Sequence, residues 1–301
     1  MTAIEMKGVS KTYFRASRPA LQGVDLIIPP GERVGLIGAN GSGKTTLLRL
    51  LMSFVLPDEG DIRIWGENNL EKTRKYLGFV PERQEGMENF TPRELLRISA
   101  RMYGIKEDQA IPRINELLQF AELTAVADDL LSDFSKGMAQ RAQICIALMH
   151  RPPILLLDEP MSGLDPGGQE DVRNLLFRLE DLTMIYASHN LEEIETFCSA
   201  VIIIHDGKII EKLDLREIRR EIFTMEIPSS AAAVLDGFRG LNPKVLWRDG
   251  ESMQIQVISD SDSIQKFMAE LNTQQVAIKR LRSRGVLEDY YYRYVVSAKS
   301  S

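Results

Sequence analysis

The sequence predicts an α/β fold with a mostly parallel sheet and a helical insert, followed by a small α+β domain. Buried-type apolar runs at 34–37, 154–157 and 184–187 alternate with helix-compatible stretches, as in a parallel sheet covered on both faces. Between about 90 and 150 the apolar residues follow a helical period. After Leu213 a new series of short strands and helices begins. We therefore expect domains at 1–212 and 213–301.

The composition narrows the class of protein. The chain has 301 residues, 44% of them hydrophobic and 27% charged, and a net charge of −6. This acidic balance disfavours a nucleic-acid-binding protein, so we expect no nucleic acid partner. Two isolated cysteines, Cys145 and Cys198, indicate neither a disulfide framework nor a zinc site, which fits the cytoplasm. No run approaches the ~20 apolar residues of a membrane span, and no secretory signal is visible. If the protein works at a membrane, another chain must supply the spans.

The N-terminal part, residues 4–28, reads as short strands with turns at Gly8 and Gly23. A turn at 29–32 leads into the apolar strand 34–37, and a helix-compatible stretch follows at 46–52. Between strand and helix lies a complete phosphate-binding loop of the G-x-x-x-x-G-K-[ST] type, at residues 38–45. The strand, the loop and the helix have the order that this motif requires.

The phosphate-binding loop indicates a nucleoside triphosphate. Its glycines let backbone N–H groups turn inward around phosphate oxygens, and the helix N-terminus favours the same anion. Lys44 is expected to reach the β and γ phosphates, and the Thr45 hydroxyl to bind Mg²⁺. The nucleotide contacts that we expect are Gly38, Ala39, Asn40, Gly41, Ser42, Gly43, Lys44, Thr45 and Thr46.

The helical insert begins at a recognisable signal. Thr91 is a cap residue, Pro92 occupies the first helical position and Glu94 lies three residues after the cap. A second helix is expected at 111–121. Beyond the insert, the apolar strand 154–157 ends in two acids, Asp158 and Glu159, at the sheet edge that also carries the phosphate loop.

These two acids suggest a division of labour in phosphate hydrolysis. Asp158 can hold the Mg²⁺ shell, as Walker B acids do, and Glu159 can then polarise a water for attack on the γ phosphate. A helix at 168–180, a strand at 184–187 and a hairpin at 201–210 complete the expected sheet.

With these residues in place, the first 212 residues resemble an ATP-binding cassette (ABC) ATPase, a P-loop NTPase of the RecA-like kind. Five further segments match that family in the correct order. They are Tyr13 at the adenine position, 79–82 at the Q-loop, 134–141 at the signature, 162–165 at the D-loop and Ser188-His189 at the switch loop.

The resemblance implies how such a cassette works. Ser135 and Gly137 of the signature would close over the γ phosphate bound by an opposite subunit, so ATP would lie between two cassettes in a homodimer or a pseudo-dimer with a similar chain. His189 would contact the γ phosphate, which gives Glu159, His189 and Lys44 as catalytic residues. Tyr13 would pack on adenine through its π face, and the alternative is a half-buried strand tyrosine.

Two departures from the family pattern have consequences. Glu82 stands where glutamine is usual, and either Glu82 or the nearby Gln84 could serve the Mg²⁺ site with Thr45 and Asp158. Lys136 and Met138 replace the usual signature residues, and the resulting S-K-G-M variant is similar to cassettes of ABC-2-type exporters for drugs, antibiotics or sodium. The segment 287–292 resembles one near the end of such cassettes.

The C-terminal domain reads as strands at 222–227, 244–247, 253–258 and 276–281, with helices at 230–238, 262–271 and 287–295. The order β-α-β-β-α-β-α is that of a ferredoxin-like unit with one extra helix.

The function expected from the resemblance is the ATP-binding, ATP-hydrolysing subunit of an ABC-2-type exporter. It would lie on the inner face of the cell membrane and drive a separate permease through the helical insert and the loop 84–90. The alternative is an ABC ATPase without a permease that acts on nucleic acid or the ribosome. Against it, the sequence has no sustained heptads and only one phosphate loop. The signature and Glu159 disfavour a P-loop kinase or GTPase.

Overall fold

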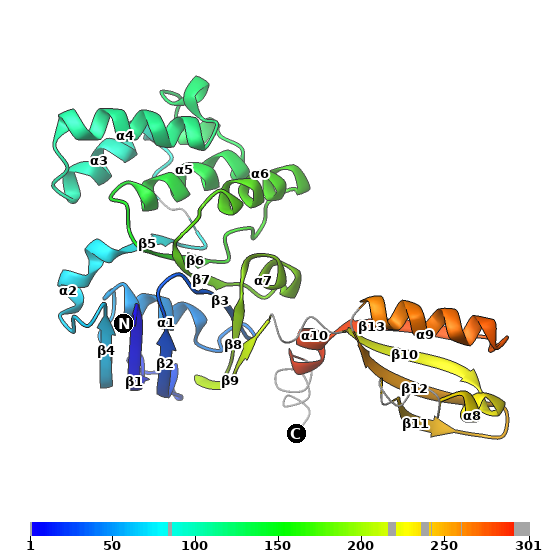
Figure 1. The fold of residues 1–301 in the computed structure, drawn as a ribbon. Coiled ribbons are helices and arrows are strands. Elements are labelled where there is room, and N and C mark those ends of the chain that lie inside the picture. Colours follow the sequence, from blue (N-terminus) through cyan, green and yellow to red (C-terminus); the bar gives the residue numbers. More distant parts are fainter. Residues whose placement is uncertain are drawn as a thin grey trace. The chain divides into compact units, whose positions relative to one another are not determined.

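The structure is a computed structural model that describes residues 2–83, 86–215, 221–235, 241, 243–259 and 261–291. The chain folds into two compact units, Met1–Leu213 and Asp214–Ser301. Each unit is described by itself, and Figure 1 gives the labels used for helices and strands.

A three-stranded antiparallel sheet forms the N-terminal part of the first unit. Its strands are β1 (Ile4–Lys11), β2 (Leu21–Ile28) and β4 (Glu59–Ile64), in the order β2-β1-β4. Buried and exposed residues alternate along β2, as expected of a sheet with one face in the core. Strand β4 was not predicted, because its Glu-Gly-Asp start has low strand propensity.

The second sheet of this unit is six-stranded and positions the site. Its order is β5 (Leu77–Val80), β6 (Ile154–Asp158), β7 (Thr183–Ala187), β3 (Arg33–Ile37), β8 (Ala200–His205) and β9 (Lys208–Asp214). The pairs β5–β6, β6–β7, β7–β3 and β3–β8 are parallel. Every residue of β6 and β7 is buried. Because these strands run the same way, the ends of β3 and β6 lie at one edge of the sheet.

Helix α1 (Lys44–Leu51) lies between the two sheets. Its Leu47, Leu48, Leu50 and Leu51 share one core cluster with residues of β1 and β2 on one side and of β3 and β6 on the other. The core therefore fixes the helix whose first turn is the end of the phosphate-binding loop. Shorter elements follow β4, namely α2 (Leu70–Thr73) and η1 (Arg74–Tyr76).

The predicted helical insert is present. It contains α3 (Pro92–Met102), α4 (Glu107–Phe120), the short turns η2 (Thr124–Val126) and η3 (Leu131–Asp133), and α5 (Lys136–Leu148). Figure 1 shows α3, α4 and α5 together on one side of the strands. Thr91 and Glu94 form the expected reciprocal cap. Helix α4 begins four residues before the predicted start, because Glu107 and Asp108 fit the positive end of a helix and Pro112 is accommodated within it.

Two helices connect the later strands of the first unit. Helix α6 (Pro166–Phe177) starts two residues before the predicted position, with Asp165 as its cap. Helix α7 (Leu191–Phe197) follows the predicted switch loop and packs on β3 through Ile194. No helix among the described residues has the length and apolar character needed to span a bilayer.

The second unit has an antiparallel sheet of β10 (Glu221–Pro228), β11 (Lys244–Arg248), β12 (Ser252–Ser259) and β13 (Arg280–Gly285). The order β11-β12-β10-β13 is the split βαβ arrangement of a ferredoxin-like unit. Helix α9 (Ser261–Thr273) packs Phe267 and Leu271 on the sheet. The connection after β10 contains η4 (Ser229–Ala231) and the short helix α8 (Ala232–Leu235).

The last predicted strand, at 276–281, was placed wrongly. The strand is the arginine-rich segment Arg280–Gly285, whereas Val276 and Ile278 pack against the core cluster ahead of it. The apolar residues ahead of β13 fill the core, and in the sequence they resembled a strand. Pairing with β10 places the actual strand a few residues later. The last helix, α10, spans Val286–Tyr291, and the rest of the predicted 287–295 segment lies outside the described residues.

Candidate functional site

The phosphate-binding loop has the backbone that its sequence predicts. Gly43 precedes α1 with φ of 114°, in a region that side chains rarely adopt. A Cβ at this position would also lie 2.6 Å from the carbonyl oxygen of Ala20. Gly43 is therefore required both by its backbone angle and by the close approach of the neighbouring chain. Lys44 folds back over the loop, and its Nζ donates to the carbonyl oxygen of Gly38 at 2.8 Å.

A cavity of about 400 Å³ lies over this loop. Most of the predicted nucleotide and catalytic residues line it together, although they come from distant parts of the chain. The lining residues are Ala20, Ala39, Asn40, Gly41, Ser42, Gly43, Lys44, Thr45, Thr46, Glu82, Asp158, Glu159, Ser162 and His189. Gly38 contributes through its contact with Lys44 rather than as part of this lining.

Lys44 is buried, with 7% of its side chain exposed, and its Nζ lies 3.9 Å from Oε1 of Glu159. Burial lowers the pKa of Lys44, and the negative charges of Glu159, Asp158 and Glu82 act in the opposite direction. The cavity thus combines one lysine with three carboxylates. A polyphosphate that entered this cavity would need further positive charge beside those carboxylates.

Asp158 supplies the observation that a cation fits here. Its side chain is buried, and its Oδ1 is a buried atom without a hydrogen-bond partner among the described residues. Burial is the main cause that raises the pKa of Asp158. Glu159 and Glu82 act in the same direction, and a hydrogen bond with Thr45 opposes it. A buried carboxylate oxygen beside a threonine hydroxyl is a suitable donor set for Mg²⁺, which prefers hard oxygen ligands.

The described residues contain no group of three or more acidic, histidine or cysteine side chains that would hold a metal alone. In nucleotide sites Mg²⁺ takes one or two protein ligands and completes its shell with phosphate and water.

Glu159 lines the cavity in a strained backbone conformation. Its φ is 49°, which is uncommon for a residue with a side chain. The Glu159 N–H donates to the carbonyl oxygen of Ala187 at 2.8 Å, and this bond ties the end of β6 to the end of β7. Strain of this kind is found at functional sites, where surrounding contacts hold it.

His189 meets Glu159 directly. Nδ1 of His189 lies 2.8 Å from Oε2 of Glu159. Because a carboxylate only accepts hydrogen bonds, Nδ1 carries the proton in this arrangement. The His189 side chain is 62% exposed, whereas that of Glu159 is 12% exposed. The histidine thus stands at the open side of the cavity and the carboxylate at its floor.

Of the two alternatives at the Q-loop position, the structure describes one. Glu82 lines the cavity, and its charge acts on both Lys44 and Asp158. Gln84 lies outside the described residues. Glu82 is thus close enough to influence a cation held by Asp158.

Tyr13 is not among the described residues that line this cavity, and its hydroxyl oxygen is buried without a hydrogen-bond partner among the described residues. Ala20, from the same N-terminal loop, lines the cavity instead. Contact between Tyr13 and adenine stays a prediction.

Ser135 and Gly137 lie outside this cavity, at the start of α5. The Ser135 hydroxyl accepts from the N–H of Met138 at 3.2 Å and caps the helix. Gly137 faces α6 so closely that a Cβ on it would lie 2.9 Å from Cα of Gly168. The signature edge is thus a capped helix start outside the lining of the nucleotide cavity, and its contact with nucleotide stays a prediction.

Sequence reasoning gave no role to two residues that the structure brings to the site. Ala20 lies in a loop without a distinctive motif. Glu193, on α7, accepts hydrogen bonds from the Ser188 hydroxyl and the Asn190 amide, next to His189 in the switch loop. The only available signal for Glu193 was its position one turn after the switch loop, in a run of acids that reads as a solvated helix start.

Comparisons with known proteins place these features in a family. The model of the ABC transporter family matches residues 21–162. The chain is 30% identical to the bacitracin transport ATP-binding protein BcrA of Bacillus licheniformis, over 98% of this chain and 97% of that protein. It is 36% identical to the Nod factor export ATP-binding protein I of Paraburkholderia xenovorans, over 69% of each chain.

A solved structure shows the same architecture. The ATP-binding cassette MJ0796, in a dimeric post-hydrolysis state bound to ADP and Pi, matches with a TM-score of 0.64 and 30% identity. The match covers 71% of this chain and 99% of that cassette. The first unit therefore has the fold of a complete cassette.

Proposed function

This chain belongs to the ABC transporter family, and from that premise we propose that it is the ATP-hydrolysing subunit that drives an ABC-2-type exporter. The ATPase activity is that of the family. The relatives named for bacitracin transport and Nod factor export favour an exporter over a permease-free ATPase that acts on nucleic acid or the ribosome. The subunit would lie on the cytoplasmic face of the membrane.

One observation carries the proposal: Lys44, Asp158 and Glu159 line a single cavity over the phosphate loop, and a buried Asp158 oxygen there lacks a partner among the described residues. Lys44 would contact the β and γ phosphates, whose oxygens would replace the carbonyl oxygen of Gly38 as acceptors for its Nζ. Thr45 and Asp158 would hold Mg²⁺, with Glu82 beside them. When bound, Mg²⁺ supplies charge neutralisation for the phosphates.

Glu159 would act as the base. Its carboxylate faces the cavity and would accept a proton from the water that attacks the γ phosphate. His189 would move from Glu159 to the γ phosphate and orient that water. The strained backbone at Glu159 and its bond to Ala187 support this role, because they fix the main chain from which the carboxylate projects into the cavity.

The second half of the site would come from a twin chain, or from a similar cassette. Ser135 and Gly137 present a hydroxyl and a helix start, and they lie outside the chain's own cavity. The dimeric state of the MJ0796 cassette supports this arrangement.

A trapped dimer tests the second half of the site. We expect the Glu159→Gln variant to form a dimer with ATP and Mg²⁺ when its mass is measured by light scattering. The additional change Ser135→Ala should weaken that dimer, whereas Ser132→Ala, on the nearby turn η3, should not. A Glu159→Gln protein that stays monomeric at saturating ATP would contradict the proposal.

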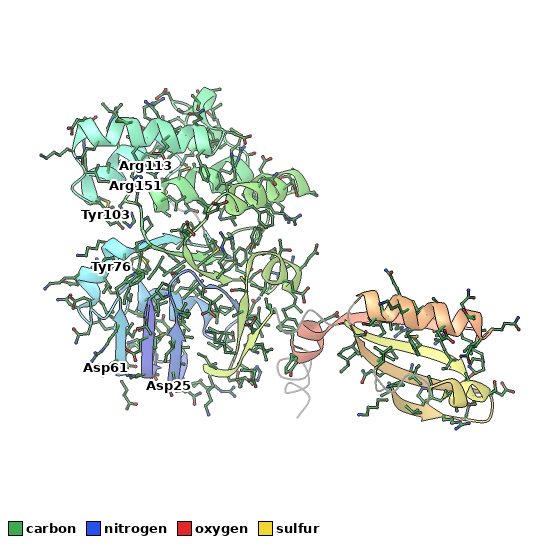
Figure 2. The ribbon with its side chains drawn as sticks, viewed as in Figure 1. Asp25, Asp61, Tyr76, Tyr103, Arg113 and Arg151 are labelled. Atoms are coloured by element: carbon green, nitrogen blue, oxygen red, sulfur yellow. The ribbon has the colours of Figure 1, made fainter. Side chains whose placement is uncertain are left out.

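A groove beside the nucleotide cavity fits the expected permease contact. It has a volume of about 840 Å³ and lies between α3, α5 and β5. Apolar side chains on its wall are unusually exposed: Phe54 56%, Ile98 40%, Met102 80% and Tyr103 37%. Figure 2 labels Tyr103 at the edge of the helical insert that faces the strands. Exposed apolar surface of this kind marks interaction sites.

The wall of the groove also contains a buried amide without a hydrogen-bond partner among the described residues. Gln143 is 4% exposed, and both its amide nitrogen and its amide oxygen are buried without hydrogen bonds among the described residues. An incoming peptide segment would supply both a donor and an acceptor. Thr45, Glu82 and Asp158 line the groove as well as the nucleotide cavity, so a permease segment in the groove would approach the Mg²⁺ ligands.

Copurification tests the groove. A tagged chain from solubilised membranes is expected to retain a membrane subunit with about six spans, identified by mass spectrometry. Met102→Asp should remove that subunit, and Ile111→Asp, which changes an exposed residue of α4 outside the groove lining, should not. Retention of the same subunit by Met102→Asp would count against this surface.

A further inference from the structure

A second carboxylate lies behind Glu159 and belongs to Glu193, in the first turn of α7. Its Oε2 accepts hydrogen bonds from the hydroxyls of Tyr186 and Ser188, each at 2.9 Å. Its Oε1 accepts from Nδ2 of Asn190 at 3.2 Å. The donors come from the end of β7, the switch loop and the start of α7, so one side chain joins three consecutive pieces of the chain.

The direction of the bond from Tyr186 is fixed. Tyr186 is fully buried, and burial, followed by the charge of Glu193, raises its pKa above the ordinary value. The phenol therefore keeps its proton and donates a hydrogen bond to Glu193.

The Ser188 hydroxyl has a choice between two carboxylates. Its Oγ lies 2.9 Å from Oε2 of Glu193 and 3.4 Å from Oε2 of Glu159. The same oxygen accepts the N–H of Asn190 at 3.0 Å. A hydroxyl has one proton, so a bond to Glu193 leaves none for Glu159. The shorter distance favours Glu193 as the acceptor.

We propose that Glu193 is a positioning residue for ATP hydrolysis, because it accepts the hydrogen bond of the Ser188 hydroxyl and so keeps the Glu159 carboxylate free to accept a proton from water. This inference rests on the proposed role of Glu159 as the base. Oε2 of Glu159 is then open to the attacking water once His189 moves to the γ phosphate. Without Glu193, the hydroxyl turns to Glu159, which is the other carboxylate within its reach.

A hydrogen bond from Ser188 to Glu159 occupies an acceptor position on Oε2 that the attacking water would otherwise use. The same change leaves the phosphate loop and Lys44 untouched. Loss of Glu193 therefore lowers kcat rather than the affinity for ATP. Removal of the Ser188 hydroxyl in the same molecule removes the unwanted donor and restores the rate.

The test is the Mg-ATPase rate of the full chain with Glu193→Ala, alone and combined with Ser188→Ala. We expect Glu193→Ala to lower kcat about tenfold, the factor that corresponds to about 1.4 kcal/mol in the barrier. KM for ATP should stay within about twofold of the parental value. The double variant should be faster than Glu193→Ala. A residue with only a structural role would give a double variant at least as slow as the single one.

Two further variants keep the test decisive. Glu193→Gln keeps the volume of the side chain and one acceptor oxygen, so this variant should lose less activity than Glu193→Ala. If Glu193→Ala does not fold, Glu193→Gln takes its place in the test. Glu192→Gln changes the exposed neighbouring acid and should retain the parental kcat. Parental kcat in Glu193→Ala, or no recovery in the double variant, would overturn the inference. Turnover by Glu159→Gln would instead overturn the assignment of the base, so the two failures are distinguishable.

Discussion

Nδ1 of His189 lies 2.8 Å from Oε2 of Glu159, so the two expected catalytic groups are hydrogen-bonded to each other. In this arrangement the histidine occupies the carboxylate that is expected to act on water. A γ phosphate in the cavity would offer His189 a more strongly charged acceptor. ATP binding would thereby release Glu159 at the moment when its substrate arrives.

The first prediction concerns Glu159→Gln. We expect steady-state ATP hydrolysis to fall by a factor of at least about 10², because general bases contribute ~10²–10⁴ in rate. ATP affinity should be retained, because Lys44 and the phosphate loop are unchanged. A phosphate-release assay gives the rate, and titration with a fluorescent ATP analogue gives the affinity. Hydrolysis near the parental rate would show that another group acts on water.

The second prediction concerns the contact between α5 and α6. Replacement of glycine by alanine inside a helix usually stabilises a protein by up to about 1 kcal/mol. Gly137→Ala should instead destabilise, because its Cβ would lie 2.9 Å from the backbone of Gly168 and would force the helices apart. Gly167→Ala is the matched control, because its nearest neighbour is the Asp165 carboxylate at 3.6 Å. Urea unfolding should show a loss for Gly137→Ala only.

The third prediction concerns the buried acid of the metal site. Because the pKa of Asp158 is raised in the folded protein, its ionised form opposes folding once the pH exceeds its ordinary range. Asp158→Asn should therefore stabilise the Mg²⁺-free protein at pH 7 by about 1 kcal/mol, because replacing a functional group that opposes folding commonly raises stability at the expense of activity. It should also abolish ATP hydrolysis.

The matched control is Asp61→Asn, an exposed acid of β4, which should leave both stability and activity unchanged. Thermal unfolding with and without Mg-ATP measures the stability of both variants. An Asp158→Asn protein that unfolds at a lower temperature than the parent without Mg²⁺ would contradict the destabilisation assigned to the buried Asp158 carboxylate.

The fourth prediction concerns His150. Its ring stacks on Tyr103 with centroids 3.6 Å apart, and burial lowers its pKa from 6.5 to about 4. The unfolded chain therefore binds a proton before the folded protein does, so stability is lost as the pH falls from about 6.5 toward 4. His150→Gln should lose less stability over that range than the parent, as measured by the shift in Tm between pH 7 and pH 4.5. His205→Gln, near the turn at Asp206 and Gly207, should lose as much as the parent.

The features that the sequence predicted well are local. Glycines, lysine and threonine at fixed spacing between a strand and a helix define the phosphate loop, because backbone conformation and anion contact are decided within a few residues. Asp158 and Glu159 were equally predictable, since a buried strand of a parallel sheet delivers its C-terminal residues to one edge. The capped start of α3 follows from Thr91, Pro92 and Glu94 alone.

The features that it did not predict depend on contacts between distant segments. The arginine-rich strand β13 is defined by its pairing with β10, whereas apolar Val276 and Ile278 resembled a strand while they pack elsewhere. Glu193 resembled a solvated acid until folding brought Tyr186, Ser188 and Asn190 around it. No short-range pattern specifies either outcome.

Thr45, Glu82 and Asp158 form a wall common to the nucleotide cavity and the apolar groove. Because of this shared wall, we expect ATP in the cavity and a membrane subunit in the groove to affect each other's binding. By thermodynamic linkage, each then changes the affinity of the other by the same factor. A membrane subunit that tightened ATP binding tenfold would itself be held tenfold more firmly in the ATP-loaded state, a coupling of about 1.4 kcal/mol. The rate of ATP hydrolysis would then set how long this chain stays tightly bound to the membrane subunit.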